Sequence, residues 1–238
     1  MAIDAKTCDE ITRLTLEMWL DKAAKDDVFL GLTHGKERGH RMADFVDERT
    51  TALLKVHFVT RFQSGKGGTA RARSMGDVWL KSGGLFNPIN VKTGVSGANG
   101  QPNLVSLKKL LRALLNDQID SYYLLFVKFE LVPVVRPKVF LVDLLDHLDF
   151  ATYDDGPGQI MLYEEKFFRA MEDGSCGSST SIVTKIERLF VLLKDGNRRL
   201  ISNRERTIVE FEKAIADYKK QSTHAINQST LGFTDESN

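Results

Sequence analysis

The sequence predicts a mixed α/β fold of the α+β kind, in which a central mixed β-sheet is flanked by helices and followed by a helical C-terminal part. Two observations predict this class. Stretches with apolar residues at helical spacing surround a group of short, dense apolar runs that are rich in β-branched and aromatic residues. No internal repeat or Pro/Ser-rich linker divides the 238 residues, so a single domain is expected. Its core is expected at about 35–145, a helical C-terminal region at about 150–222 and a frayed tail at 223–238.

Three stretches in the first half of the chain show the periodicity of amphipathic helices. Residues 8–25 and 40–58 place apolar side chains every three or four positions, and leucines recur in the same way through 104–117. The second of these stretches is expected to pack on the core through Met42, Phe45, Val46 and Leu53.

The strands are expected between and after these helices. Residues 77–81 (DVWLK) and 89–93 (INVKT) are short runs separated by turn residues, which predicts a β-hairpin. The runs 121–132 and 137–145 are almost continuously apolar, as is typical of central buried strands.

Two further helices are expected near the C-terminus, at 181–195 and 204–221, on either side of an arginine-rich junction. Before them, Asp143, Asp146 and Asp149 recur every three residues, a spacing that favours a solvated acidic helix face.

Composition and charge are those of a globular protein, with 42% hydrophobic and 27% charged residues. A formal net charge of +1 means that any DNA-binding surface must come from local clusters of basic residues. The two cysteines have no partners at metal-ligand spacing, which excludes a zinc module and favours a reducing compartment. Since no apolar core of a signal peptide and no apolar run of about 20 residues is seen, a cytoplasmic protein without membrane contact is expected.

One acid and one lysine stand at the predicted hairpin in a pattern that suits phosphodiester hydrolysis. Asp77 opens the first strand, and Asn90 and Lys92 lie on the second, on one face because residues two apart in a strand share a face. Hydrolysis of a phosphodiester needs an activated water, a divalent cation and a positive charge near the phosphate. Carboxylates are suitable ligands for Mg²⁺, and lysine is a compact point charge. The backbone carbonyl of Val91, between Asn90 and Lys92, is a further available oxygen ligand.

These residues, together with the acidic helix at 40–54, resemble the PD-(D/E)xK nuclease superfamily, in particular type II restriction endonucleases. The resemblance covers about residues 35 to 145 and implies a restriction-endonuclease-like core. It implies a Mg²⁺-dependent deoxyribonuclease, with Mn²⁺ as a substitute metal, that acts as a homodimer on a short site in double-stranded DNA. The chain departs from the family pattern at Asn90, where a second carboxylate normally stands.

The resemblance also assigns roles to individual residues. Asp77 is expected to hold the metal, with Glu48 or Asp44 from the acidic helix completing the site and Glu48 slightly better placed. Asn90 is expected to act as a weaker ligand or to orient the water, because an amide oxygen is neutral. Lys92 is expected to position the nucleophile or to stabilise the developing charge.

Two loops flank the hairpin and offer candidate DNA contacts. Residues 63–76 contain Lys66, Arg71 and Arg73 just before Asp77, and these cations suit either phosphate contacts or a solvated loop. The same stretch lacks the glycine spacing of a P-loop, so no nucleotide cofactor is expected.

After Lys92, amide side chains that could read adenine edges alternate with turn residues. A turn-forming role explains the asparagines equally well. The remaining candidate DNA contacts are Thr93, Asn99, Gln101, Asn103 and Lys108.

Two other functions stay open from the sequence. One is a DNA repair or recombination nuclease that recognises structure instead of sequence, and the other is a non-catalytic DNA-binding protein that kept the fold but lost its metal site at Asn90.

Overall fold

A computed structural model of the whole chain describes most of its residues. The described residues are 3–26, 29–31, 38–61, 75–82, 85–95, 103–131, 134–154, 156, 158–173 and 180–231. The chain consists of two units, Met1–Leu193 and Lys194–Asn238.

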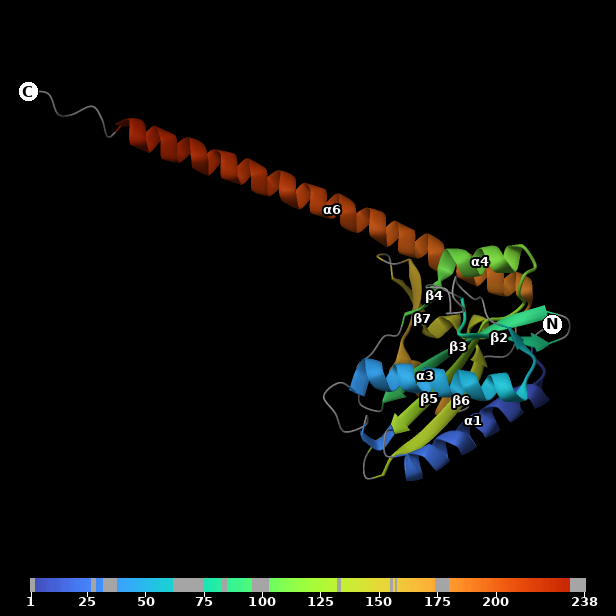
Figure 1. Cartoon of the computed structure of the whole chain (residues 1–238). Coiled ribbons are helices and arrows are strands. Elements are labelled where there is room, and N and C mark those ends of the chain that lie inside the picture. Colours follow the sequence, from blue (N-terminus) through green and yellow to red (C-terminus); the bar gives the residue numbers. More distant parts are fainter. Residues whose placement is uncertain are drawn as a thin grey trace, which may run out of the picture. The chain divides into compact units, whose positions relative to one another are not determined.

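The first unit contains a mixed β-sheet with strand order β1-β2-β3-β5-β6 (Figure 1). The strands are β1 (Thr60–Arg61), β2 (Val78–Ser82), β3 (Leu85–Val95), β5 (Tyr123–Glu130) and β6 (Arg136–Asp143). β3 and β5 pair in parallel, and the other neighbours pair antiparallel. The predicted mixed sheet and the predicted β2–β3 hairpin are therefore confirmed.

Helices cover both faces of this sheet. The helices α1 (Ala5–Lys25) and α3 (Arg38–His57) lie on one face, while α4 (Leu107–Leu115) lies on the other, as Figure 1 shows. The helix α5 (Glu164–Glu172) packs through Phe167 and Phe168 into the same hydrophobic cluster as α4. Since parallel neighbours need a crossover connection, α4 lies between β3 and β5 in the chain.

Alternation along β5 explains why this strand is buried on both sides. Leu124 and Phe126 pack into the cluster that contains α4 and α5. Leu125 and Val127 point the other way, toward α1 and α3. All four side chains are fully buried, as predicted for a central strand. The prediction was wrong for β6, which forms an edge of the sheet.

A second, three-stranded sheet includes residues that were predicted to belong to the helix α4. It has the order β4-β8-β7, and its strands are β4 (Asn103–Ser106), β7 (Ala151–Asp154) and β8 (Gln159–Leu162). Leu104 and Val105 were expected to be helical, but they lie in β4, which pairs with β8. This strand partner is more than 50 residues away, so local periodicity could not reveal it.

The turn of the β2–β3 hairpin is shorter than predicted. Residues 85–88 were expected to belong to the turn, but they form the start of β3. Pro88 is tolerated there because β3 pairs with β5 only from Ile89 onward, so only the β2 side is paired at the proline.

The C-terminal region forms one helix, α6 (Ile182–Leu231), instead of the two that were predicted. Gly196 stands at the expected junction, but a single helical glycine costs only about 1 kcal/mol relative to alanine and does not end a helix. The helix also continues into the segment 223–231, which was expected to be frayed. Among the described helices, none is both long enough and apolar enough to cross a membrane.

The aspartates 143, 146 and 149 do not form a solvated helix face. Asp143 ends β6, and Asp146 ends a short 3₁₀ helix, Leu144–Asp146. Both carboxylates contact the buried ammonium group of Lys185, at 2.7 Å and 3.1 Å. Their role is therefore to neutralise a buried lysine, which a spacing pattern alone does not predict.

Candidate active site

The predicted acid–lysine pair lies where β2 and β3 separate. Val78 is the first residue of β2 and pairs with Ile89, so beyond Ile89 only β5 flanks β3. Asp77 occupies the open edge: its backbone N–H donates to the carbonyl of Ile89 at 2.9 Å, and its carboxylate Oδ2 accepts from the N–H of Val91 at 2.7 Å. These two hydrogen bonds fix the carboxylate beside the Asn90–Lys92 segment.

Gly76 makes this placement possible because the backbone before Asp77 runs very close to β3. A Cβ at Gly76 would lie 2.9 Å from the Cβ of Pro88 and 3.0 Å from the carbonyl oxygen of Ile89. We expect Gly76→Ala to push the Asp77 backbone away and to lower stability by about 1–3 kcal/mol, as overpacking does.

Thermal unfolding measures this effect. The control is Gly31→Ala, because a Cβ there would meet nothing within 4 Å. Equal melting temperatures for the two variants would show that the close backbone approach at Gly76 does not affect stability.

The acid that α3 contributes to this edge is Asp47. The buried residues of α3 recur every four positions as Met42, Val46, Thr50 and Leu54. Asp47 follows Val46 by one residue and lies on the margin of this stripe, half-buried, whereas Glu48 is a further 100° around the helix and exposed. The structure thus brings Asp47 to the site in the place that the sequence favoured for Glu48.

The predicted stripe was rotated because one polar residue was overlooked. Thr50 is fully buried, and its hydroxyl accepts a hydrogen bond of 3.0 Å from the indole N–H of Trp19 on α1. With Thr50 and Leu54 in the core instead of Leu53, the inward face turns toward Asp47.

Burial and mutual repulsion perturb the two carboxyl groups. Burial, the charge of Asp77 and that of Asp44 raise the pKa of Asp47 to about 7, while the Lys92 ammonium opposes the shift. Burial also raises the pKa of Asp77, against the Lys92 charge and the hydrogen bond from Val91. The charges of Asp77 and Lys92 thus act on the Asp47 carboxyl, and these three residues form a cluster drawn from α3, the residue before β2, and β3. Two acids that resist ionisation beside a lysine are typical of functional sites.

Asn90 is held rigidly next to Asp77. Its side-chain NH₂ donates to the carbonyl of Leu104 at 3.2 Å and to the hydroxyl of Tyr122 at 2.8 Å. Burial raises the pKa of Tyr122, and the nearby Asp77 charge adds to the rise. The amide orientation is therefore fixed by two donations, which an aspartate at this position could not make.

One buried oxygen of the cluster and one of the neighbouring Asn90 have no hydrogen-bond partner among the described residues. They are Oδ1 of Asp47 and Oδ1 of Asn90. A buried acceptor without a partner costs about 1–3 kcal/mol, so such atoms call for a water or a cation.

These oxygens suit a hard divalent cation. Mg²⁺ keeps several waters and is usually held by one or two carboxylates, which Asp47 and Asp77 can supply, together with the amide oxygen of Asn90. Within the described residues, no three His, Cys, Asp or Glu side chains come together as a metal site, so a cation here would rely on the amide, the backbone and water.

The neighbours of Lys92 on β3 point to the opposite face. The side chain of Val91 is 2% exposed and packs in the core, as predicted, while its carbonyl remains the expected backbone ligand. The hydroxyl of Thr93 is buried with no hydrogen-bond partner in the described part of the chain, and its phosphate contact stays a prediction.

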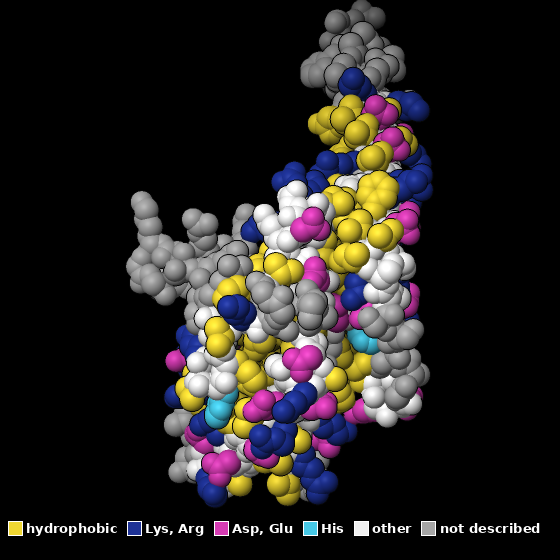
Figure 2. Space-filling model, turned by 90° about the vertical axis from the view of Figure 1, so that its right-hand side faces the viewer, with side chains coloured by type: hydrophobic (Ala, Val, Ile, Leu, Met, Phe, Trp, Pro, Cys, Tyr) yellow, Lys and Arg dark blue, Asp and Glu magenta, His cyan; other side chains and the backbone are white. Residues whose placement is uncertain are grey.

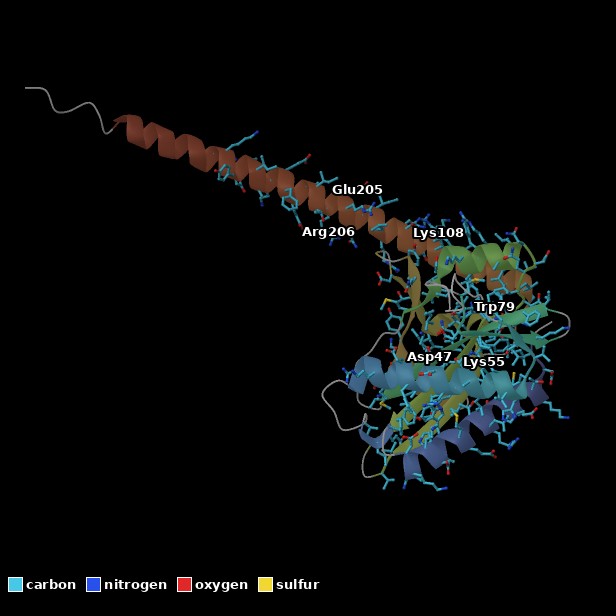
Figure 3. The ribbon with its side chains drawn as sticks, in the orientation of Figure 1. Asp47, Lys55, Trp79, Lys108, Glu205 and Arg206 are labelled. Atoms are coloured by element: carbon cyan, nitrogen blue, oxygen red, sulfur yellow. The ribbon has the colours of Figure 1, made fainter. Side chains whose placement is uncertain are left out.

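The remaining predicted residues lie away from the cluster or outside the described residues. Asp44 is exposed on α3 and acts on Asp47 only through its charge. Lys108 is exposed on α4, on the other side of the sheet from Asp47 (Figure 3). Asn103 begins β4, but its side chain is not described. Outside the described residues lie Lys66, Arg71, Arg73, Asn99 and Gln101.

Sequence reasoning missed a further acid near β3. A Cβ at Gly94, two residues after Lys92, would overlap Oε1 of Glu164, the first residue of α5. Burial raises the pKa of Glu164 to about 7, and Lys128 partly offsets the rise. The Lys128 ammonium also lies 4.3 Å from the ring centre of Phe168. No motif in the sequence pointed to Glu164, because α5 reaches β3 only through tertiary packing.

Neither a protein-family model nor a curated protein sequence matches this chain.

Proposed function

We propose that this protein is a Mg²⁺-dependent endodeoxyribonuclease that cuts double-stranded DNA at a specific short site, as a type II restriction enzyme does. The observation that carries the proposal is the cluster of Asp47, Asp77 and Lys92 at the edge of β3, where the backbone of Asp77 bonds Ile89 and its carboxylate bonds Val91. The hydrogen bond from Val91 to Asp77 holds that cluster in register with Asn90.

Each residue of the cluster has a role in this chemistry. Asp77 and Asp47 would hold the cation, and the amide oxygen of Asn90 would hold either the cation or one of its waters. A bound Mg²⁺ supplies the Lewis acidity that hydrolysis of a phosphodiester needs. Lys92 would face the scissile phosphate and stabilise the negative charge that develops on its oxygens.

Because Asn90 is neutral, the proposed site depends on the ionisation of its two carboxyl groups. With a neutral amide in the usual place of an acid, only Asp47 and Asp77 carry negative charge beside Lys92. Because the pKa of Asp47 is about 7, both acids are ionised only in neutral to alkaline solution. The proposed enzyme should therefore work best above neutral pH.

A plasmid-cleavage assay with Mg²⁺ or Mn²⁺ tests the proposal. We expect discrete fragments from the wild-type chain and none from Asp77→Ala or Lys92→Ala, a loss of at least roughly 10²–10³-fold. The control is Lys81→Ala, which removes an exposed lysine from the neighbouring strand β2 and should leave the fragments unchanged.

Other results would favour the other functions. DNA binding without cleavage in either metal would show a non-catalytic DNA-binding protein. Cleavage confined to branched or nicked substrates would show a structure-specific nuclease.

A further inference from the structure

Two buried acceptors hold the NH₂ group of Asn90. The carbonyl of Leu104 and the hydroxyl of Tyr122, which we call the amide socket, accept hydrogen bonds from it at 3.2 Å and 2.8 Å. On the surface, charged side chains are interspersed with hydrophobic ones, as Figure 2 shows for one face. The amide socket lies beneath the surface, since Tyr122 is fully buried and Asn90 is 5% exposed. Bulk water therefore does not readily replace a lost partner there.

The amide socket determines which end of the Asn90 side chain is available to a cation. A carbonyl oxygen only accepts hydrogen bonds, so the group that points at Leu104 is the NH₂ group. Because the amide is planar, this also fixes the position of its oxygen. An unsupported asparagine could turn about its Cβ–Cγ bond and present N–H donors, which do not bind a cation. The oxygen has no hydrogen-bond partner among the described residues and is the end left for a ligand.

Tyr122 is itself held in place by its backbone and its ring. Its N–H donates to Oδ1 of Asp143 at 3.1 Å, and its carbonyl accepts from the N–H of Leu144 at 2.8 Å. The other carboxylate oxygen of Asp143 contacts the buried ammonium of Lys185 at 2.7 Å. The ring of Tyr122 packs in the same hydrophobic cluster as α4 and α5. These contacts fix the hydroxyl independently of Asn90.

We propose that Tyr122 is a positioning residue of the cation site: together with the carbonyl of Leu104, its hydroxyl holds the Asn90 amide with the oxygen toward the cation. Tyr122 acts through Asn90 and touches neither the cation nor the phosphate. The inference rests on the proposed function, from which it takes the cation, Mg²⁺ or Mn²⁺. It also explains why an amide stands at position 90, since an ionised carboxylate has no donor for the two acceptors.

Titration of the full-length chain with Mg²⁺ and with Mn²⁺, in the absence of DNA, tests this role. Tyr122→Phe removes only the hydroxyl and should weaken the binding of both cations about tenfold or more, as the loss of a group behind a metal ligand typically does. Calorimetry or the cation-dependent rise in melting temperature measures the affinity.

The matched control is Tyr123→Phe. Tyr123 is also buried, and its hydroxyl accepts from the N–H of Ile3 at 2.8 Å in a different hydrophobic cluster. The control variant thus loses a comparable buried hydrogen bond without a contact to Asn90. Its cation affinity should stay within about twofold of that of the wild type. A loss equal to that in Tyr122→Phe would show a general effect on the fold and would contradict the inference.

A double-mutant cycle separates positioning from structural support. Asn90→Ala removes the group on which Tyr122 acts and should itself weaken cation binding. In that background, the further change Tyr122→Phe should weaken binding by less than about twofold, because residues in one network do not contribute additively. An undiminished effect of Tyr122→Phe beside Ala at position 90 would overturn the inference.

Nuclear magnetic resonance of the metal-free wild-type chain gives a measurement that does not depend on the folding of a Tyr122 variant. The Asn90 NH₂ protons, assigned by their absence from Asn90→Ala, should exchange slowly with water because they are buried and hydrogen-bonded. Exchange as fast as that of Asn203, an exposed asparagine on α6, would show that the amide is not held.

Failure of this inference and failure of the nuclease proposal give different results. Equal cation affinity of Tyr122→Phe and the wild type would overturn the inference, and so would a wild-type chain that binds neither cation, whatever the plasmid assay shows. Weakened binding in Tyr122→Phe, together with a wild-type chain that does not cleave DNA, would support the inference for a cation site and refute the nuclease.

Discussion

Replacing Asp47 by asparagine is expected to reduce Mg²⁺-dependent cleavage by roughly 10²–10³-fold, the range for losing one group that stabilises developing charge. The physical reason is that Asp47 and Asp77 are the two carboxylates of the cluster that includes Lys92. A neutral amide at position 47 would leave Asp77 as the sole charged ligand. Cleavage should be measured above about pH 8, where the Asp47 carboxyl is ionised.

The matched control is Glu48→Gln, one residue along α3. Glu48 is exposed on another side of the helix, so its loss should change cleavage by less than about twofold. A separate readout is metal binding: Mg²⁺ should raise the melting temperature of the wild-type chain and of Glu48→Gln, but not that of Asp47→Asn. If Glu48→Gln were the inactive variant, the assignment of Asp47 would be wrong.

The stability of the metal-free protein should fall as the pH rises from about 4 to about 7. The pKa of Asp47 is about 7 in the folded chain, against an ordinary value of 3.8. Below the ordinary value, both the folded and the unfolded chains hold the proton. As the pH rises, the unfolded chain releases this proton first and is stabilised by ionising. The folded chain either keeps the proton or carries a poorly solvated carboxylate, so the free energy of unfolding falls. Asp77 contributes in the same direction because its pKa is also raised.

Asp47→Asn should remove most of this dependence. Near about pH 4 the variant and the wild-type chain should melt together, since a protonated carboxyl and an amide are both neutral. Near about pH 8 the metal-free variant should melt several degrees higher, at roughly 2–4 °C for each kcal/mol. Thermal unfolding in the presence of a chelator measures the difference, with Glu48→Gln as the control. A gap between variant and wild type that is the same at both pH values would contradict the raised pKa.

Local patterns predicted the parts of the site that lie close together in the chain. Asp77 and Lys92 belong to one hairpin, and the short runs around them alternate as half-buried strands do. The sequence therefore predicted that Asp77 and Lys92 lie on the two neighbouring strands of a hairpin, close to Asn90. It also predicted that Val91 points into the core.

The choice between Asp47 and Glu48 on α3 is one that local sequence patterns could not make. The four-residue spacing of buried positions on α3 includes Thr50, which a reading of apolar residues leaves out. Thr50 is buried because the indole of Trp19 donates to it, and that partner belongs to another helix. Met42 and Val46 are buried as predicted, but Leu54 is buried in place of Leu53, so the buried face extends toward Asp47 and away from Glu48.

By itself, the sequence determined the helices α1 and α3, the mixed sheet, and the β2–β3 hairpin that places Asp77 near the Asn90–Lys92 segment, because hydrophobic period and turn chemistry are local. Only the tertiary structure decided that Asp47 joins them, that Tyr122 and Leu104 hold Asn90, and that Leu104 lies in a strand. Each of these depends on a partner that is distant in the chain, and burial by a distant partner is also what raises the pKa of Asp47.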